Sequence, residues 1–218
     1  MKYTTPLQIH AYDVLKQMIL EDRFLPDKIH SERRISEELG ISRTPLRDAI
    51  HRLAQEGYID VIPSKGFQLH KMTAEDLVNT YEIRCALEGF CVVHLAKTSD
   101  LPETKKVLHT LEGIVQEQEN IASSTYDIES FASLDTEFHK RIVNSKKNPI
   151  FTDTFETYRY QMNMQTIASL QEENRLHDTV KEHRAILENM KSGNEWGSYN
   201  ATIQHIGMAQ RLININRD

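Results

Sequence analysis

The chain has 218 residues, of which 39% are hydrophobic and 27% charged, and its net charge is −6. This composition is typical of a globular protein with one large domain or two small ones. It excludes a membrane protein, because no apolar run approaches the roughly 18 residues that a span needs. The N-terminus has no signal-peptide core, so we expect a cytoplasmic protein. Cys85 and Cys91 lie six residues apart in one predicted helix. They therefore point to different faces, and we expect two free thiols.

The negative charge is confined to one part of the chain. Residues 1–70 contain 10 Lys+Arg and 10 Asp+Glu, whereas residues 71–218 contain 16 and 22. A local basic face can bind phosphates even in an acidic protein, so nucleic-acid binding by the first part remains open. Five arginines gather there within twenty residues: Arg33, Arg34, Arg43, Arg47 and Arg52.

The first 70 residues predict three helices and a hairpin. Ser31 and Ser42 are favourable N-caps, and Gly40 suits the left-handed position that ends the second helix. Two helices joined by a short turn and followed by a hairpin indicate a winged helix-turn-helix over residues 1–71. In chain order the predicted elements are helices over 9–19, 31–39 and 42–56 and strands over 58–62 and 66–69.

The chain after Met72 is predicted to be entirely helical. Thr73 and Asp76 form a capping box at the start of the first helix. Turn-forming segments near residues 100, 124, 148, 172 and 193 divide the remainder into six helices. We therefore expect a mainly α protein whose second domain, residues 72–218, is an antiparallel helical bundle.

The helix predicted over residues 42–56 has the features of a recognition helix. Such a helix presents donors for guanine edges and phosphates from its first two turns. Arg43 and Arg47 are four residues apart and share one face there. At the tip of the predicted wing, Lys65 and Gly66 could approach a minor groove, since glycine lets the backbone come close.

Two independent spacings bring four metal-ligating side chains together in the helical domain. Asp135 and His139 are spaced i, i+4 and project from one helix face. His183 and His205 are equidistant from residue 194, which lies in a predicted helix–helix turn, so they stand level on neighbouring helices. One carboxylate and three imidazoles suit zinc, with nickel, manganese or iron as alternatives.

Two other interpretations of the bundle stay open. It could bind no metal and serve only for dimerisation. It could also be a metal-dependent hydrolase, although Glu137 and Glu182, the carboxylates next to the ligands in sequence, are predicted to point away from them.

Arg84 and Glu88 fall on an apolar helix face, where an uncompensated charge is costly. Either they pair with each other, or Arg84 faces a cavity and receives a ligand carboxylate bidentately.

The N-terminal motifs resemble the GntR family of bacterial regulators. They are Ser31-Glu32-Arg33, the run Ile41-Ser42-Arg43-Thr44-Pro45-Leu46-Arg47-Asp48-Ala49-Ile50, Gly57-Tyr58-Ile59 and Gly66. Asp27 departs from the pattern, because glycine is usual after Pro26. The resemblance implies that Arg33, Arg43 and Arg47 contact DNA, with Thr44 on the backbone and Lys65 and Gly66 in the minor groove.

The helical domain resembles the FCD subgroup of that family. Asp135-x-x-x-His139, Glu182-His183 and His205 match its metal-ligand pattern, and Asn148 and the Arg84/Glu88 pair match too. The resemblance implies a small organic-acid effector, and we expect Arg84, Glu88 and Asn148 to bind it. We also expect a homodimer that places two recognition helices about one DNA turn apart on a near-palindromic operator, and a repressor with no enzymatic activity.

Overall fold

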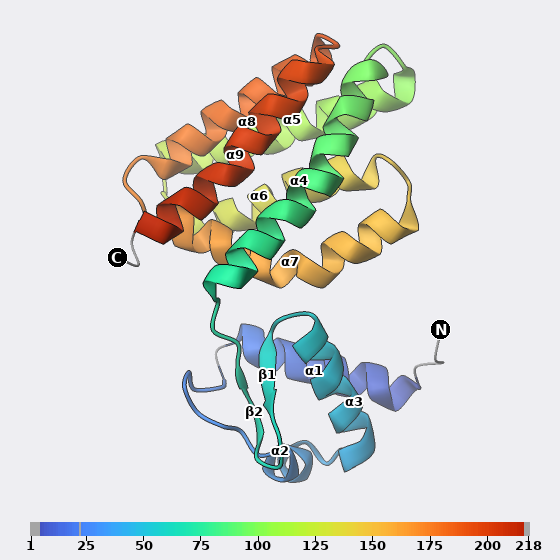
Figure 1. Cartoon of the computed structure of the whole chain (residues 1–218), viewed down its shortest axis with the longest axis vertical. Helices are drawn as coiled ribbons and strands as arrows, with labels where there is room; N and C mark the ends of the chain where they lie inside the picture. Colours follow the sequence, from blue (N-terminus) through green and yellow to red (C-terminus); the bar gives the residue numbers. More distant parts are fainter. Residues whose placement is uncertain (1–4, 22, 216–218) are drawn as a thin grey trace. The chain divides into compact units, whose positions relative to one another are not determined.

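A computed structural model describes residues 5–21 and 23–215. The described residues form two compact units, and the chain passes from the first to the second between Met72 and Thr73 (Figure 1). The first is a winged helix-turn-helix and the second contains six helices, so the predicted mainly α fold class is confirmed.

The first unit is built from three helices and a two-stranded wing. Thr5 and Gln8 form a capping box at the start of the first helix, which packs against the third. Gly40 ends the second helix with φ +63°, as predicted, and Asp27 adopts φ +60° at the position where the resemblance implies glycine. The elements are α1 (Pro6–Leu20), α2 (Glu32–Leu39), α3 (Arg43–Gln55), β1 (Ile59–Ile62) and β2 (Gly66–Leu69).

The wing is anchored to the segment that precedes α2. Strands β1 and β2 are antiparallel, and Ile62 pairs with Gly66 at the turn. His30 exchanges backbone hydrogen bonds with Phe67, at 2.7 and 3.0 Å. Gly66 has φ +136°, and a Cβ there would lie 2.0 Å from the His30 carbonyl oxygen. Close approach of this carbonyl, within the protein itself, therefore requires the glycine. Gly66 is also buried, and approach of the wing turn to a minor groove stays a prediction.

The second unit is an antiparallel bundle in which α8 and α9 lie side by side and α9 packs along α4 (Figure 1). The predicted capping box of Thr73 and Asp76 starts α4. Large side chains such as Phe131 and Phe138 are fully buried between the helices. Within the described residues, no helix has the length and apolarity to cross a membrane. The helices are α4 (Ala74–Lys97), α5 (Pro102–Ser123), α6 (Ile128–Asn144), α7 (Pro149–Leu170), α8 (Arg175–Lys191) and α9 (Glu195–Ile215).

Candidate functional sites

The start of α3 presents a polar face to solvent. Arg43, Thr44 and Arg47 are exposed, while Leu46 and Ile50 are fully buried and hold the helix in the domain. The N-cap positions of α2 and α3 are Ser31 and Ser42, as predicted, but neither hydroxyl makes a capping hydrogen bond. Uncapped amides at a helix start can bind phosphate oxygens.

The arginines of this face are held only by weak ion pairs. Arg47 Nη2 lies 3.2 Å from Glu32 Oε2, and Arg33 Nε lies 2.8 Å from Glu37 Oε1. Arg43 makes no ion pair with any residue that the structure describes. Exposed pairs of this kind are worth at most about 1 kcal/mol, so phosphates could replace them. Lys65 is also exposed, at the wing turn.

Arg52, the last arginine of the basic group, has a structural role instead. Its guanidinium carbon lies 3.7 Å from the centre of the Tyr12 ring, and its Nε donates to Glu56 at 3.0 Å. Tyr12 also donates to Glu56, at 2.6 Å. Arg52 therefore joins α3 to α1.

The four predicted metal ligands converge inside the helical bundle. Asp135 and His139 come from α6, His183 from α8 and His205 from α9, all four are buried, and their ligand atoms lie within 4.8 Å of one another. The Nε2 atom of His205 lies 3.1 Å from that of His139 and 3.3 Å from that of His183. The Asp135 carboxylate lies 3.5 Å from His183 Nε2 and 3.8 Å from His139 Nε2.

The other nitrogen of each imidazole is held by an acceptor. Glu88 Oε2 lies 2.5 Å from Nδ1 of His139, and Glu182 Oε2 lies 2.7 Å from Nδ1 of His205. For His183, the acceptor is Gln118 Oε1, at 2.8 Å from Nδ1. Acceptors at all three Nδ1 atoms place the protons there, so the three Nε2 lone pairs point at a common centre.

The electrostatics favour neutral imidazoles at His183 and His205 and an ionised carboxylate at Glu88. Burial and the charges of the neighbouring histidines lower the pKa of His183 well below its usual value. Burial also lowers the pKa of His205, although Glu182 opposes this shift. Burial alone would raise the pKa of Glu88, but Arg84 and His139 outweigh it and lower that pKa to about 2.

These separations fit a divalent transition metal. Zinc–nitrogen bonds of about 2.0–2.1 Å in a tetrahedral site place ligand atoms about 3.3 Å apart. Three pairs of ligand atoms, His139–His205, His183–His205 and Asp135–His183, are 3.1 to 3.5 Å apart, and all four ligand atoms lie within 4.8 Å of one another. The neutral imidazoles and the carboxylate are the donor set that such a metal takes.

The residues predicted to bind an effector have partners within the protein. Arg84 Nε donates to Glu88 Oε1 at 2.7 Å, and both side chains are buried, so the first of the two alternatives for this pair is present. Asn148 is the N-cap of α7, where its Oδ1 accepts the Ile150 N–H at 3.0 Å. Contact of these residues with an effector stays a prediction.

Sequence reasoning missed the outer residues of the cluster. The expectation that Glu182 points away from the ligands was wrong, because it ignored α9. Glu182 does turn away from His183 on α8, but that turn directs it at His205 on the neighbouring helix. Gln118 comes from α5, 65 residues before its partner, and no local pattern marks it.

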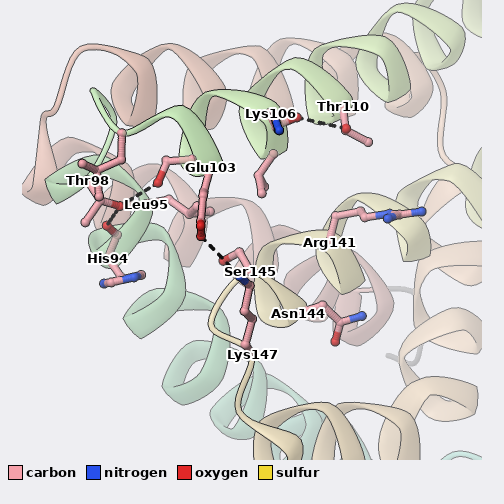
Figure 2. Close-up of a pocket in the computed structure, with 13 residues that line it drawn as sticks. His94, Leu95, Thr98, Glu103, Lys106, Thr110, Arg141, Asn144, Ser145 and Lys147 are labelled. Carbon is pink, nitrogen blue, oxygen red and sulfur yellow. Dashed lines mark hydrogen bonds and ion pairs between the residues drawn. The ribbon is translucent and has the colours of Figure 1, made fainter.

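A separate cleft of about 480 Å³ opens between the end of α4, the start of α5 and the end of α6 (Figure 2). Glu103 and Lys147 pair within it at 3.2 Å (Figure 2), and Lys106 and Arg141 also line it. The predicted metal ligands are not among its lining residues. The cleft and the His/Asp cluster are therefore different sites.

Comparison with known proteins finds one family model in each part of the chain. Residues 7–69 match the bacterial regulatory proteins of the gntR family, and residues 79–208 match the FCD domain. An HTH-type transcriptional regulator of Bacillus subtilis, YdhC, is 28% identical over 202 residues, which are 92% of this chain and 88% of the relative. The HTH-type transcriptional repressor RspR of Escherichia coli is 28% identical over 156 residues, 72% of this chain and 66% of the relative.

Solved structures share the fold at low sequence identity. The structure of E. coli McbR/YncC has a TM-score of 0.74 at 19% identity and covers 98% of this chain and 100% of its own. A GntR transcriptional regulator from Rhodococcus sp. RHA1 has a TM-score of 0.75 at 16% identity, covering 96% and 99%.

Proposed function

The chain belongs to the gntR family of bacterial regulatory proteins and carries an FCD domain, and on this premise we propose what controls it. It is a DNA-binding transcription regulator and not an enzyme. We propose that it is a homodimeric cytoplasmic repressor. Its helical domain binds a divalent metal, with zinc preferred, and a small carboxylate effector beside the metal.

The convergence of three Nε2 lone pairs and a carboxylate carries this proposal. Asp135, His139, His183 and His205 would hold the metal, which when bound would act as a Lewis-acid anchor for an oxygen of the effector. Without such a cation, the lone pairs of His139 and His183 would face that of His205 at 3.1 and 3.3 Å without a proton between them. A bundle that only dimerises would not need this unfavourable contact, whereas a bound cation would relieve it.

The buried charges around the cluster indicate the charge of the effector. Three carboxylates, those of Asp135, Glu88 and Glu182, are opposed by two guanidiniums, those of Arg84 and Arg175. A divalent cation turns this net charge of about −1 into +1, and a monocarboxylate would neutralise it. Arg84, whose Nε is bonded to Glu88, would offer its terminal amines to that carboxylate.

On the DNA side, we propose that Arg43 and Arg47 read bases in the major groove while Arg33 and Thr44 bind the backbone. Lys65, with the wing turn at Gly66, would reach the minor groove. A dimer would place two such heads on the halves of a near-palindromic operator about one DNA turn apart. The repressor assignment is supported by the name of the E. coli relative RspR.

The experiment combines metal analysis with DNA selection. Full-length protein is purified without chelator, its metal content is measured by mass spectrometry, and its operator is selected from a random DNA library. We expect about one metal per chain in the wild type and in His109→Ala, a control whose side chain is 90% exposed, but none in His183→Ala. Substoichiometric metal in all three proteins would favour a bundle that only dimerises.

A panel of monocarboxylates and dicarboxylates is then tested for release of the selected DNA. We expect release by a monocarboxylate from the metal-loaded wild type and no release from His183→Ala. Equal release from both proteins would contradict the placement of the effector beside the metal.

A further inference from the structure

His205 differs from the other predicted ligands in how it is held. Asp135 and His139 share one helix face of α6, so the helix itself fixes one relative to the other. His183 stacks on Phe138, with ring centres 4.1 Å apart. His205 is the single ligand on α9, and the contact of its Nδ1 with Glu182 Oε2, at 2.7 Å, sets the orientation of its ring.

Glu182 is in turn held by a buried arginine. Arg175 Nη1 and Nη2 donate to Glu182 Oε1 and Oε2 at 2.7 and 2.8 Å. The two residues are seven apart, which is two turns of α8, so they lie on the same helix face. Arg175 is the first residue of α8, and Asn174 before it adopts φ +61°. The left-handed conformation of Asn174 ends the preceding segment, so that α8 begins at Arg175, two turns before Glu182 on the same helix face.

We propose that Arg175 is a positioning residue for the metal centre. It fixes both oxygens of Glu182, and Glu182 fixes His205 with its proton on Nδ1 and its Nε2 directed at the other ligands. The inference rests on the metal site of the proposed function, because it assigns residues that act on the metal through His205.

Two features distinguish this arrangement from an ordinary ion pair. The planar fork of a guanidinium holds both oxygens of a carboxylate in one orientation, and the compact ammonium of lysine lacks this fork. A second arginine–glutamate–histidine chain borders the cluster, in which Arg84 donates from Nε alone to Glu88 Oε1 and Glu88 Oε2 contacts Nδ1 of His139. Arg84 and Glu88 lie on α4, whereas Arg175 and Glu182 lie on α8. Two of the three imidazoles are therefore each oriented by a separate arginine–glutamate pair.

The test measures metal binding and stability separately. Arg175→Met removes the guanidinium and keeps an unbranched side chain, Arg175→Lys keeps the charge without the fork, and Glu182→Gln removes the carboxylate. The control is Arg184→Met, because Arg184 lies on the same helix and pairs with Glu119 at the surface. Affinities for Zn²⁺ and Co²⁺ are measured by competition with a chelating dye, together with the Co²⁺ absorption spectrum and the melting temperature of the metal-free protein.

We expect Arg175→Met and Glu182→Gln to weaken metal binding by about 10- to 100-fold, the usual cost of losing an outer partner of a metal-bound histidine. The Co²⁺ spectrum should shift, because the His205 ring is released. Arg175→Lys should bind with intermediate affinity, and Arg184→Met should match the wild type.

Wild-type affinity and an unchanged Co²⁺ spectrum in Arg175→Met would overturn the proposal, even if its melting temperature fell, because Arg175 would then be only structural. If Arg175→Met fails to fold, the same readouts on Arg175→Lys and Glu182→Gln decide. A wild type that binds neither metal would remove both this inference and the proposed metal site. Wild-type binding that no variant alters would remove the inference alone.

Discussion

Removal of the metal should lower the stability of the helical domain by a measurable amount. The ligands come from α6, α8 and α9, so a bound cation would tie three of the six helices together. At a free metal concentration of 100 times Kd, binding to the folded state alone contributes about 2.7 kcal/mol. For a domain of this size, each kcal/mol corresponds to about 2–4 °C in Tm. We therefore expect chelation to lower Tm by about 5–11 °C.

The chain offers a probe that reports on this domain alone. Trp196 is the sole tryptophan in the sequence and lies on α9, stacked on Tyr199 with ring centres 5.7 Å apart. Its fluorescence therefore follows unfolding of the helical domain without a contribution from the DNA-binding unit. Melting curves are recorded with excess Zn²⁺ and with EDTA for the wild type, His183→Ala and His109→Ala.

The informative quantity is the difference between the two melting temperatures of each protein. His183→Ala will be less stable under both conditions, because it also loses the stacking of His183 on Phe138, but its metal-dependent difference should vanish. His109→Ala should keep the full difference. Equal melting temperatures with and without Zn²⁺ in the wild type, or the same difference in His183→Ala, would refute the reasoning.

Three further predictions concern single side chains. Arg47→Ala should cost about 1–3 kcal/mol of affinity for the selected operator. Affinity is measured by gel shift, and Arg23→Ala should leave it unchanged, although Arg23 is similarly exposed and also pairs with a glutamate at 3.2 Å. Equal losses in the two variants would show that Arg47 does not read bases. Gly66→Ala should destabilise the wing by about 1–3 kcal/mol or more, and it should abolish DNA binding while the metal content stays unchanged. If the Gly66→Ala protein bound DNA with wild-type affinity, the predicted clash with His30 would be contradicted. Asn148→Ala should lower the Trp196-detected Tm by about 2–4 °C through loss of a helix cap worth about 1 kcal/mol. Asn148→Ser should restore it, whereas loss of the effector response in both Asn148 variants would support direct contact with the effector.

The fold was predictable because its boundaries are set by local chemistry. The left-handed turn at Gly40 and the capping box of Thr73 and Asp76 depend only on residues within four positions of each other. The sequence predicted the helix boundaries better than the hydrogen bonds made at them. Ser31 and Ser42 occupy the predicted N-cap positions, but their hydroxyls make no capping bond.

The reason for glycine at position 66 could not be inferred locally. Its left-handed backbone is compatible with any tight hairpin turn, and the wing tip suggested a role at DNA. The structure shows that His30, 36 residues earlier in the chain, approaches the same backbone. Such a contact between distant segments leaves no periodic trace in the sequence.

The four metal ligands could be predicted from local spacings, whereas the residues that hold their imidazoles come from distant segments and could not, with one exception. The four ligands follow from two spacings, one within α6 and one across the turn between α8 and α9. Glu88 and Gln118 contact their imidazoles from 51 and 65 residues away, and only the packed bundle brings them there. Glu182, however, is 23 residues from His205, and the midpoint of this pair falls in the same helix–helix turn that relates His183 to His205. The symmetry of the hairpin therefore predicts both contacts of His205, because one imidazole on α9 spans two adjacent positions on α8. One of these positions supplies a neighbouring ligand and the other supplies the carboxylate that orients the ring.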